Sequence, residues 1–84
     1  MPVTDMAVDL IDQIAEAGRA RGMTQAEIAR AAGLAAETLS RARRHPNIGL
    51  VNLLRMARVV GLKPVLVPDD PLVEKIERGG LFER

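Results

Sequence analysis

The sequence has no cysteine, a single histidine, a single aromatic residue and no long apolar run. The lack of cysteine excludes disulfides, thiolate catalysis and cysteine-ligated zinc, and it suits a reducing cytoplasm. His45 alone cannot form a multi-histidine metal site. No apolar run approaches the ~20 residues that span a bilayer, and acidic residues stand near the start, where a secretory signal would carry basic ones. We therefore expect a soluble, cytoplasmic protein with no metal, no cofactor and no membrane partner.

The composition indicates a small helical domain. Hydrophobic residues make up 48% of the 84 residues, but Phe82 is the only aromatic one, so the core must be built from aliphatic side chains and methionine. A chain of this length buries only somewhat more than ~60% of its unfolded surface, so association with a second chain would add stability. Ser40 has no recognisable base, and the glycines form neither common phosphate-binding loop, so we do not expect an enzyme.

Residues 23–44 predict two short helices joined by a glycine turn. Thr24 and Glu27 have the spacing of a capping box, in which each side chain accepts a hydrogen bond from the other residue's backbone N–H. A helix should therefore begin at Gln25. Gly33 can adopt the left-handed conformation that ends a helix and reverses the chain.

Helical spacing resumes at about Ala36. Leu39 and Ala42 are expected to face inward, which leaves a polar and basic outer face. The residues expected outward or at the flanks are Glu37, Thr38, Ser40, Arg41 and Arg44.

Residues 24–44 resemble the helix-turn-helix of the Cro and phage-repressor (Xre) family. The residues that carry the resemblance are Thr24-Gln25, Ile28-Ala29, Gly33-Leu34 and Thr38-Leu39-Ser40-Arg41. Two positions depart from the family pattern. Ala35 stands where Ser or Thr is usual, and the lost side-chain cap costs about 1 kcal/mol. Arg43 replaces a common acidic residue and makes the end of the second helix more basic.

The resemblance implies binding to double-stranded DNA and assigns a role to each matching position. Arg41 would bond guanine N7 and O6, Glu37 would accept from a cytosine amino group, and Ala36 would meet a thymine methyl. Gln25 would donate to a phosphate, which positions the protein without reading sequence. The other residues expected along the phosphates are Thr38, Arg43, Arg44 and Asn47.

Helices are predicted on both sides of this motif. The first covers residues 5–21, with Thr4 or Asp5 as its cap, and the last covers residues 50–60. The apolar residues of the last helix that we expect in the core are Leu50, Leu53, Leu54, Ala57 and Val60. The resulting fold class is an all-α domain of four to five helices. We divide the chain into a helix-turn-helix domain, residues 1–62, and an extension, residues 63–84.

Residues 62–68 are the one plausible strand, because they are rich in β-branched residues and bounded by prolines. A lone strand needs a partner. It pairs with its copy in a second subunit, or with residues 1–4, or it is not a strand; we favour the first. The resemblance supports this choice, since Xre antitoxins of the HipB kind use such a strand in dimerisation. The dimerisation residues would be Leu62, Val65, Leu66 and Val67.

The C-terminal residues predict a short amphipathic helix and an apolar tail. Asp69-Asp70-Pro71 is a helix opening, and the helix should run to about Arg78. Leu81 and Phe82 follow two glycines. The segment either packs on its own domain or clamps a neighbouring chain.

The distribution of charge is more informative than the net charge of +1. Basic residues gather between residues 19 and 45 and acidic residues gather near the C-terminus, which indicates two surfaces with different partners. Together with this charge distribution, the resemblance to the Xre family implies a homodimeric repressor that binds an inverted-repeat operator. The alternatives are an antitoxin that neutralises a toxin and autoregulates its operon, and an interaction adaptor that does not bind DNA.

Overall fold

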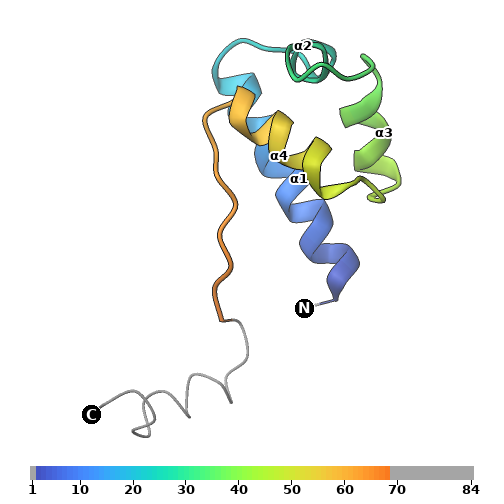
Figure 1. The fold of residues 1–84 in the computed structure, drawn as a ribbon, viewed down its shortest axis with the longest axis vertical. Coiled ribbons are helices and arrows are strands. Elements are labelled where there is room, and N and C mark those ends of the chain that lie inside the picture. Colours follow the sequence, from blue (N-terminus) through green and yellow to red (C-terminus); the bar gives the residue numbers. More distant parts are fainter. Residues whose placement is uncertain (1, 69–84) are drawn as a thin grey trace, which may run out of the picture.

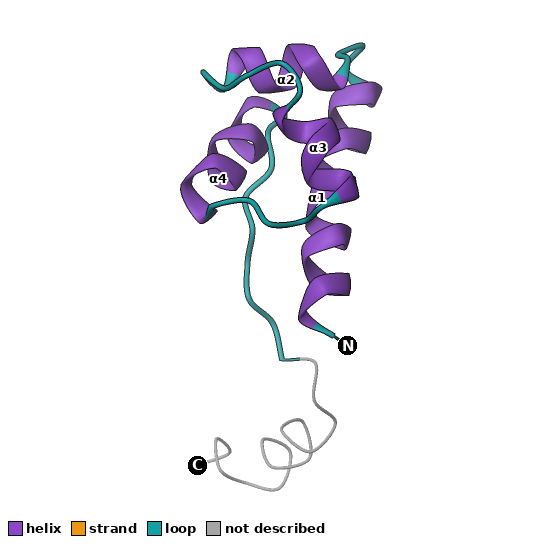
Figure 2. Ribbon diagram, turned by 90° about the vertical axis from the view of Figure 1, so that its right-hand side faces the viewer, coloured by secondary structure: helices purple, strands orange, loops and turns teal. Residues whose placement is uncertain are grey.

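A computed structural model describes residues 2–68 of the chain, and residues 1 and 69–84 lie outside the described residues. Four helices follow one another: α1 (Val3–Ala20), α2 (Gln25–Ala31), α3 (Thr38–Arg44) and α4 (Leu50–Val59) (Figure 1). Residues 2–68 contain no strand (Figure 2). The all-α class is confirmed for these residues, and the helix expected after residue 70 lies outside the described part.

The long helix α1 contacts all three of the others. Helix α2 crosses one end of the bundle and packs closely on both α3 and α4, whereas the backbones of α3 and α4 stay further apart. The two views place α3 and α4 on different sides of the bundle (Figures 1 and 2). Each of these two helices therefore exposes a face of its own.

The core is aliphatic, as predicted, and contains no buried polar or charged side chain within residues 2–68. The prediction for α4 was wrong in part, because Leu50 and Leu54 are 67% and 40% exposed. The sequence of α4 holds two overlapping apolar stripes, and the stripe that contains the fully buried Met56 faces inward. The buried residues are Ile11, Ile14, Ala15, Ile28, Ala29, Leu39, Ala42, Leu53, Met56, Ala57 and Val60.

Gly18 allows α1 to approach its neighbours closely. A Cβ at this position would overlap the side chain of Ile28 in α2 and would lie 3.3 Å from Val60 at the end of α4. A glycine within a helix costs about 0.5–1 kcal/mol relative to alanine. Here it permits the contact of three helices, which explains why it lies on the buried face.

The ends of α1 differ slightly from the prediction. The helix begins at Val3 after Pro2, whose carbonyl accepts from the Met6 N–H at 3.1 Å, and neither Thr4 nor Asp5 acts as the cap. The helix ends before Gly22, which has a φ of 76°. Proline can occupy the start of a helix because no intrahelical partner is required of its nitrogen.

Residues 62–68, called the arm below, leave the end of α4 as an extended segment (Figure 1). The last backbone hydrogen bond recorded in the described residues joins the Leu62 N–H to the Ala57 carbonyl, at 2.8 Å. Val65, Leu66 and Val67 are 67%, 100% and 72% exposed. Residues 3 and 4 belong to α1 and are not extended, as pairing with the arm would require. Pairing with a second copy stays a prediction.

Candidate nucleic-acid interface

The start of α2 is held by the predicted capping box. The Thr24 N–H donates to Glu27 Oε1 at 2.8 Å, and the Glu27 N–H donates to Thr24 Oγ1 at 3.1 Å. Gln25 is therefore the first residue of α2, as expected, and its side chain is half-buried beside α3. This box determines where the N-terminus of α2 meets the surface.

The turn between α2 and α3 depends on Gly33. Its φ of 80° lies in the left-handed region, and its N–H donates to the Arg30 carbonyl at 2.9 Å. The Leu34 N–H donates to the Ala29 carbonyl at 2.9 Å, which completes a Schellman motif and satisfies carbonyls that the helix end leaves free. The chain reverses here as predicted.

Helix α3 begins later than expected, at Thr38 rather than at about Ala36. The Thr38 N–H donates to the Ala35 carbonyl at 3.0 Å, so residues 35–38 form a separate turn. Ala35 has no side-chain oxygen with which to cap, and Glu37 makes no side-chain cap either. Ala36 and Glu37, two of the predicted base-contacting residues, therefore precede the helix.

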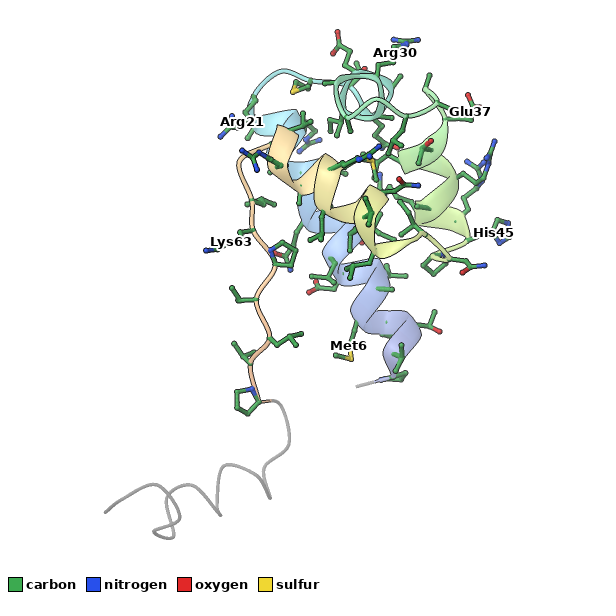
Figure 3. The ribbon with its side chains drawn as sticks, viewed as in Figure 1. Met6, Arg21, Arg30, Glu37, His45 and Lys63 are labelled. Carbon is green, nitrogen blue, oxygen red and sulfur yellow. The ribbon has the colours of Figure 1, made fainter. Side chains whose placement is uncertain are left out.

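The outward face of α3 is polar and basic. Leu39 and Ala42 are buried, while Arg41 and Arg44 are exposed on the opposite side. Figure 3 shows Glu37 and His45 at the two ends of α3, both directed away from the helical body. The described residues leave this face open.

Arg41 and Glu37 are paired. Arg41 Nη2 lies 3.6 Å from Glu37 Oε1, one turn apart, with side chains 62% and 59% exposed. An exposed pair of this kind contributes roughly 0.2–1 kcal/mol. Both residues were predicted to contact bases, so a guanine or a cytosine would have to compete with this pair or bind alongside it.

Arg43 has a second role that its position in the sequence did not reveal. Arg43 Nε donates to Asp12 Oδ1 at 3.0 Å, and this ion pair joins α3 to α1. The side chains remain 42% and 46% exposed, so a phosphate contact by Arg43 stays a prediction. Asp12 lies within α1. No local pattern links it to a residue 31 positions away.

Two hollows flank α3 and collect six of the eight residues that were predicted to contact DNA. The first is lined by Val8, Asp12, Gln25, Ser40, Arg43 and Arg44. The second is lined by Thr38, Arg41, Ala42, His45, Asn47, Ile48, Gly49 and Asn52. Asn52 was missed, although a polar residue between two pairs of apolar residues in the first turn of α4 was an available signal.

The basic run of residues 19–45 does not form one surface. Arg21 lies on the side of the molecule away from Glu37 and His45 (Figure 3), and its guanidinium approaches Gly61. Arg30 points to solvent from α2. The cationic part of the candidate interface therefore consists of the arginines of α3, with His45 beside them.

No family model, no curated protein and no solved structure matches this chain. Within residues 2–68, no group of three or more His, Cys, Asp or Glu side chains is placed to hold a metal ion. None of the described helices has both the length and the apolar character needed to cross a bilayer. The geometry of α3 and its surroundings is therefore the evidence for the candidate interface.

Proposed function

We propose that this protein is a sequence-specific DNA-binding regulator, a homodimer that represses transcription by occupying an inverted-repeat operator. The observation that carries the proposal is α3, an exposed helix that ends in three arginines and lies between two polar hollows. A helix with its side chains is about 10–12 Å across, and the major groove of B-DNA is about 12 Å wide. The helix fits that groove.

The charges on α3 support a nucleic-acid partner. Arg41 and Arg44 are exposed on its outer face, and the one acid there, Glu37, is paired with Arg41. Phosphates attract such a surface in a salt-dependent manner, whereas base edges select by hydrogen-bond geometry. Arg44, with Gln25 in the same hollow, is assigned to phosphates, and Arg41 is assigned to a guanine.

Direct readout of sequence is expected to be modest. Arg41 is the one arginine fork assigned to a base, and Ala36 offers only a methyl contact in the turn before α3. Sequence-dependent DNA shape would supply the remaining discrimination. A dimer in which two arms form an antiparallel ribbon would place the two copies of α3 about one helical turn, ~34 Å, apart on one DNA face.

Selection of bound sequences from a random DNA pool with the purified full chain tests the proposal. We expect enrichment of a two-fold symmetric motif with half-sites separated by about 10 base pairs, and affinity that falls steeply with salt. Failure to enrich any motif, with binding that does not respond to salt, would contradict the proposal. The Arg41→Ala/Arg44→Ala chain is the matched control and should enrich nothing.

An antitoxin is the second candidate, and the exposed apolar arm favours it. Val65, Leu66 and Val67 offer a surface that a toxin could cover as well as a second copy could. Co-expression with the product of an adjacent gene, followed by co-purification, would distinguish the two. The adaptor alternative requires the basic face to be covered, and no described residue covers the outer face of α3.

A further inference from the structure

Helix α4 exposes an apolar surface that the described part of the chain does not cover. Leu50, Val51 and Leu54 are 67%, 61% and 40% exposed, and Leu62 at the root of the arm is 38% exposed. These four residues, with Arg55 and Arg58 beside them, are called the α4 face. A hollow on this face is lined by Val51, Leu54, Arg55, Arg58, Leu62, Lys63 and Pro64.

The α4 face is cationic at its rim. Arg55, Arg58 and Lys63 line the hollow, no acidic residue does, and residues 50–59 contain no acid. Two copies of α4 placed face to face would bring their arginines together, which is unfavourable. Electrostatic complementarity therefore favours an occupant that is apolar on one side and acidic.

The chain itself contains a segment of that chemistry, directly after the arm. Residues 69–78 have three apolar residues at the i, i+1, i+4 spacing that Leu50, Val51 and Leu54 have on α4. These are Leu72, Val73 and Ile76. The segment also carries four acids, Asp69, Asp70, Glu74 and Glu77, and two bases, Lys75 and Arg78, so its net charge is −2. At this spacing the apolar side chains of a helix share one face.

The direction of the arm determines which copy of α4 the segment would reach. Residues 62–64 line hollows together with their own α4, and the rest of the arm then projects beyond the helices (Figure 1). Six extended residues cover about 20 Å at ~3.3 Å per residue. In an antiparallel ribbon centred on residues 62–67, residue 67 of one copy lies opposite residue 62 of the other. Residue 69 of one copy would then start beside Leu62 of the second copy, at the edge of the hollow.

We propose that residues 69–78 of one copy dock on the α4 face of a second copy, with Leu72, Val73 and Ile76 against Leu54 and Val51. Each copy docks its segment on the other. This mutual docking covers the apolar surface of both copies and places acids near Arg55, Arg58 and Lys63. It rests on the homodimer of the proposed function but not on DNA binding. It also accounts for the position of Arg55 and Arg58 at the rim of an exposed apolar surface.

Cross-linking through introduced cysteines tests the proposal, because the chain has no cysteine of its own. A Leu54→Cys chain is mixed with an isotope-labelled Ile76→Cys chain and treated with a short bis-maleimide in the absence of DNA. Leu54 is outside the core, so the substitution should leave the helical circular dichroism signal unchanged. A Glu16→Cys chain, with its cysteine on the exposed part of α1, replaces the Leu54→Cys chain in the control.

We expect the Leu54→Cys and Ile76→Cys chains to join between copies, with a yield at least about tenfold above the control pair, because docked groups meet at an effective concentration on the order of millimolar. A yield equal to the control would overturn the docking. In the Leu54→Cys/Ile76→Cys double variant, a link confined to one chain would overturn the exchange between copies. Dimerisation of the Leu54→Cys chain alone at high yield would indicate that α4 pairs with α4 instead. None of these outcomes depends on whether the protein binds DNA.

Discussion

The molecule has two cationic surfaces that differ in what surrounds the charge. On α3, Arg41 and Arg44 lie among Thr38, Ser40 and Asn47, whereas on α4 the arginines border exposed leucines and valine. Charge among polar groups suits phosphates and base edges, which stay partly hydrated in protein–DNA interfaces. Charge around an apolar centre suits a protein partner, whose interface has an apolar core and a polar rim. The two surfaces are both cationic, but their different surroundings predict different partners.

The largest expected effect comes from the arm, because a ribbon there would hold the two copies of both surfaces together. Val65→Pro and Leu66→Pro are tested in parallel, since neighbouring amides of a strand point to opposite edges and only one of the two should donate across the ribbon. At least one variant should become monomeric in ultracentrifugation and lose about 10²-fold or more in operator affinity. Val65→Thr keeps the amide and the branched side chain and should remain dimeric. Full dimers of both proline variants would rule out the ribbon.

The second prediction distinguishes the arginine of α3 that contacts a base from the one that contacts a phosphate. Arg41→Ala should cost about 1–3 kcal/mol on the selected operator and relax preference at one base position. Arg44→Ala should weaken all sequences alike and reduce the salt slope by about one unit. Anisotropy titrations on operator and random duplexes at several salt concentrations measure both. Equal losses on both duplexes for Arg41→Ala would show that this arginine does not contact a base.

The third prediction tests whether the positive charges of the α4 face contribute to dimerisation. Arg55→Glu/Arg58→Glu should weaken dimerisation by about 1–2 kcal/mol, or roughly tenfold, since each exposed pair contributes about 0.2–1 kcal/mol and reversal adds repulsion. Adding Glu74→Lys/Glu77→Lys should restore the dimerisation constant. Sedimentation equilibrium measures it. If the quadruple variant is weaker than the double variant, these charges do not face one another.

The ion pair between α1 and α3 gives the smallest effect. Asp12→Ala and Arg43→Ala should each lower the free energy of unfolding by roughly 0.2–1 kcal/mol, because the pair is about half exposed. Their effects on DNA affinity should have opposite signs. Asp12→Ala removes an acid beside the interface and frees Arg43, so affinity rises, whereas Arg43→Ala lowers it. Losses of affinity in both variants would show that the pair acts only by positioning α3.

The elements set by short-range interactions could be predicted from the sequence. The start of α2 follows from two reciprocal hydrogen bonds within four residues, and its end follows from a glycine that can take a φ of 80°. The outward position of Arg41 and Arg44 follows from helical spacing once Leu39 and Ala42 are assigned to the core. These features need no knowledge of distant residues.

The features set by packing could not be predicted. Leu50 and Leu54 form a stripe as apolar as the buried one, and only the contacts of α4 with α1 and α2 decide which stripe faces inward. The pair of Asp12 with Arg43 depends on how α3 lies against α1. The start of α3 is a different case, because the missing cap at Ala35 could be read from the sequence. Helical spacing alone still placed the start about two residues too early, at Ala36 instead of Thr38.

The most direct test of the two-surface account is a backbone amide NMR titration of the full dimeric chain with the selected operator duplex. The account predicts that chemical-shift changes concentrate at the amides of Gln25 and residues 36–47. The amide resonances of Val51, Leu54 and Arg58 on α4 should not shift. Changes concentrated on α4, with residues 36–47 unaffected, would contradict it.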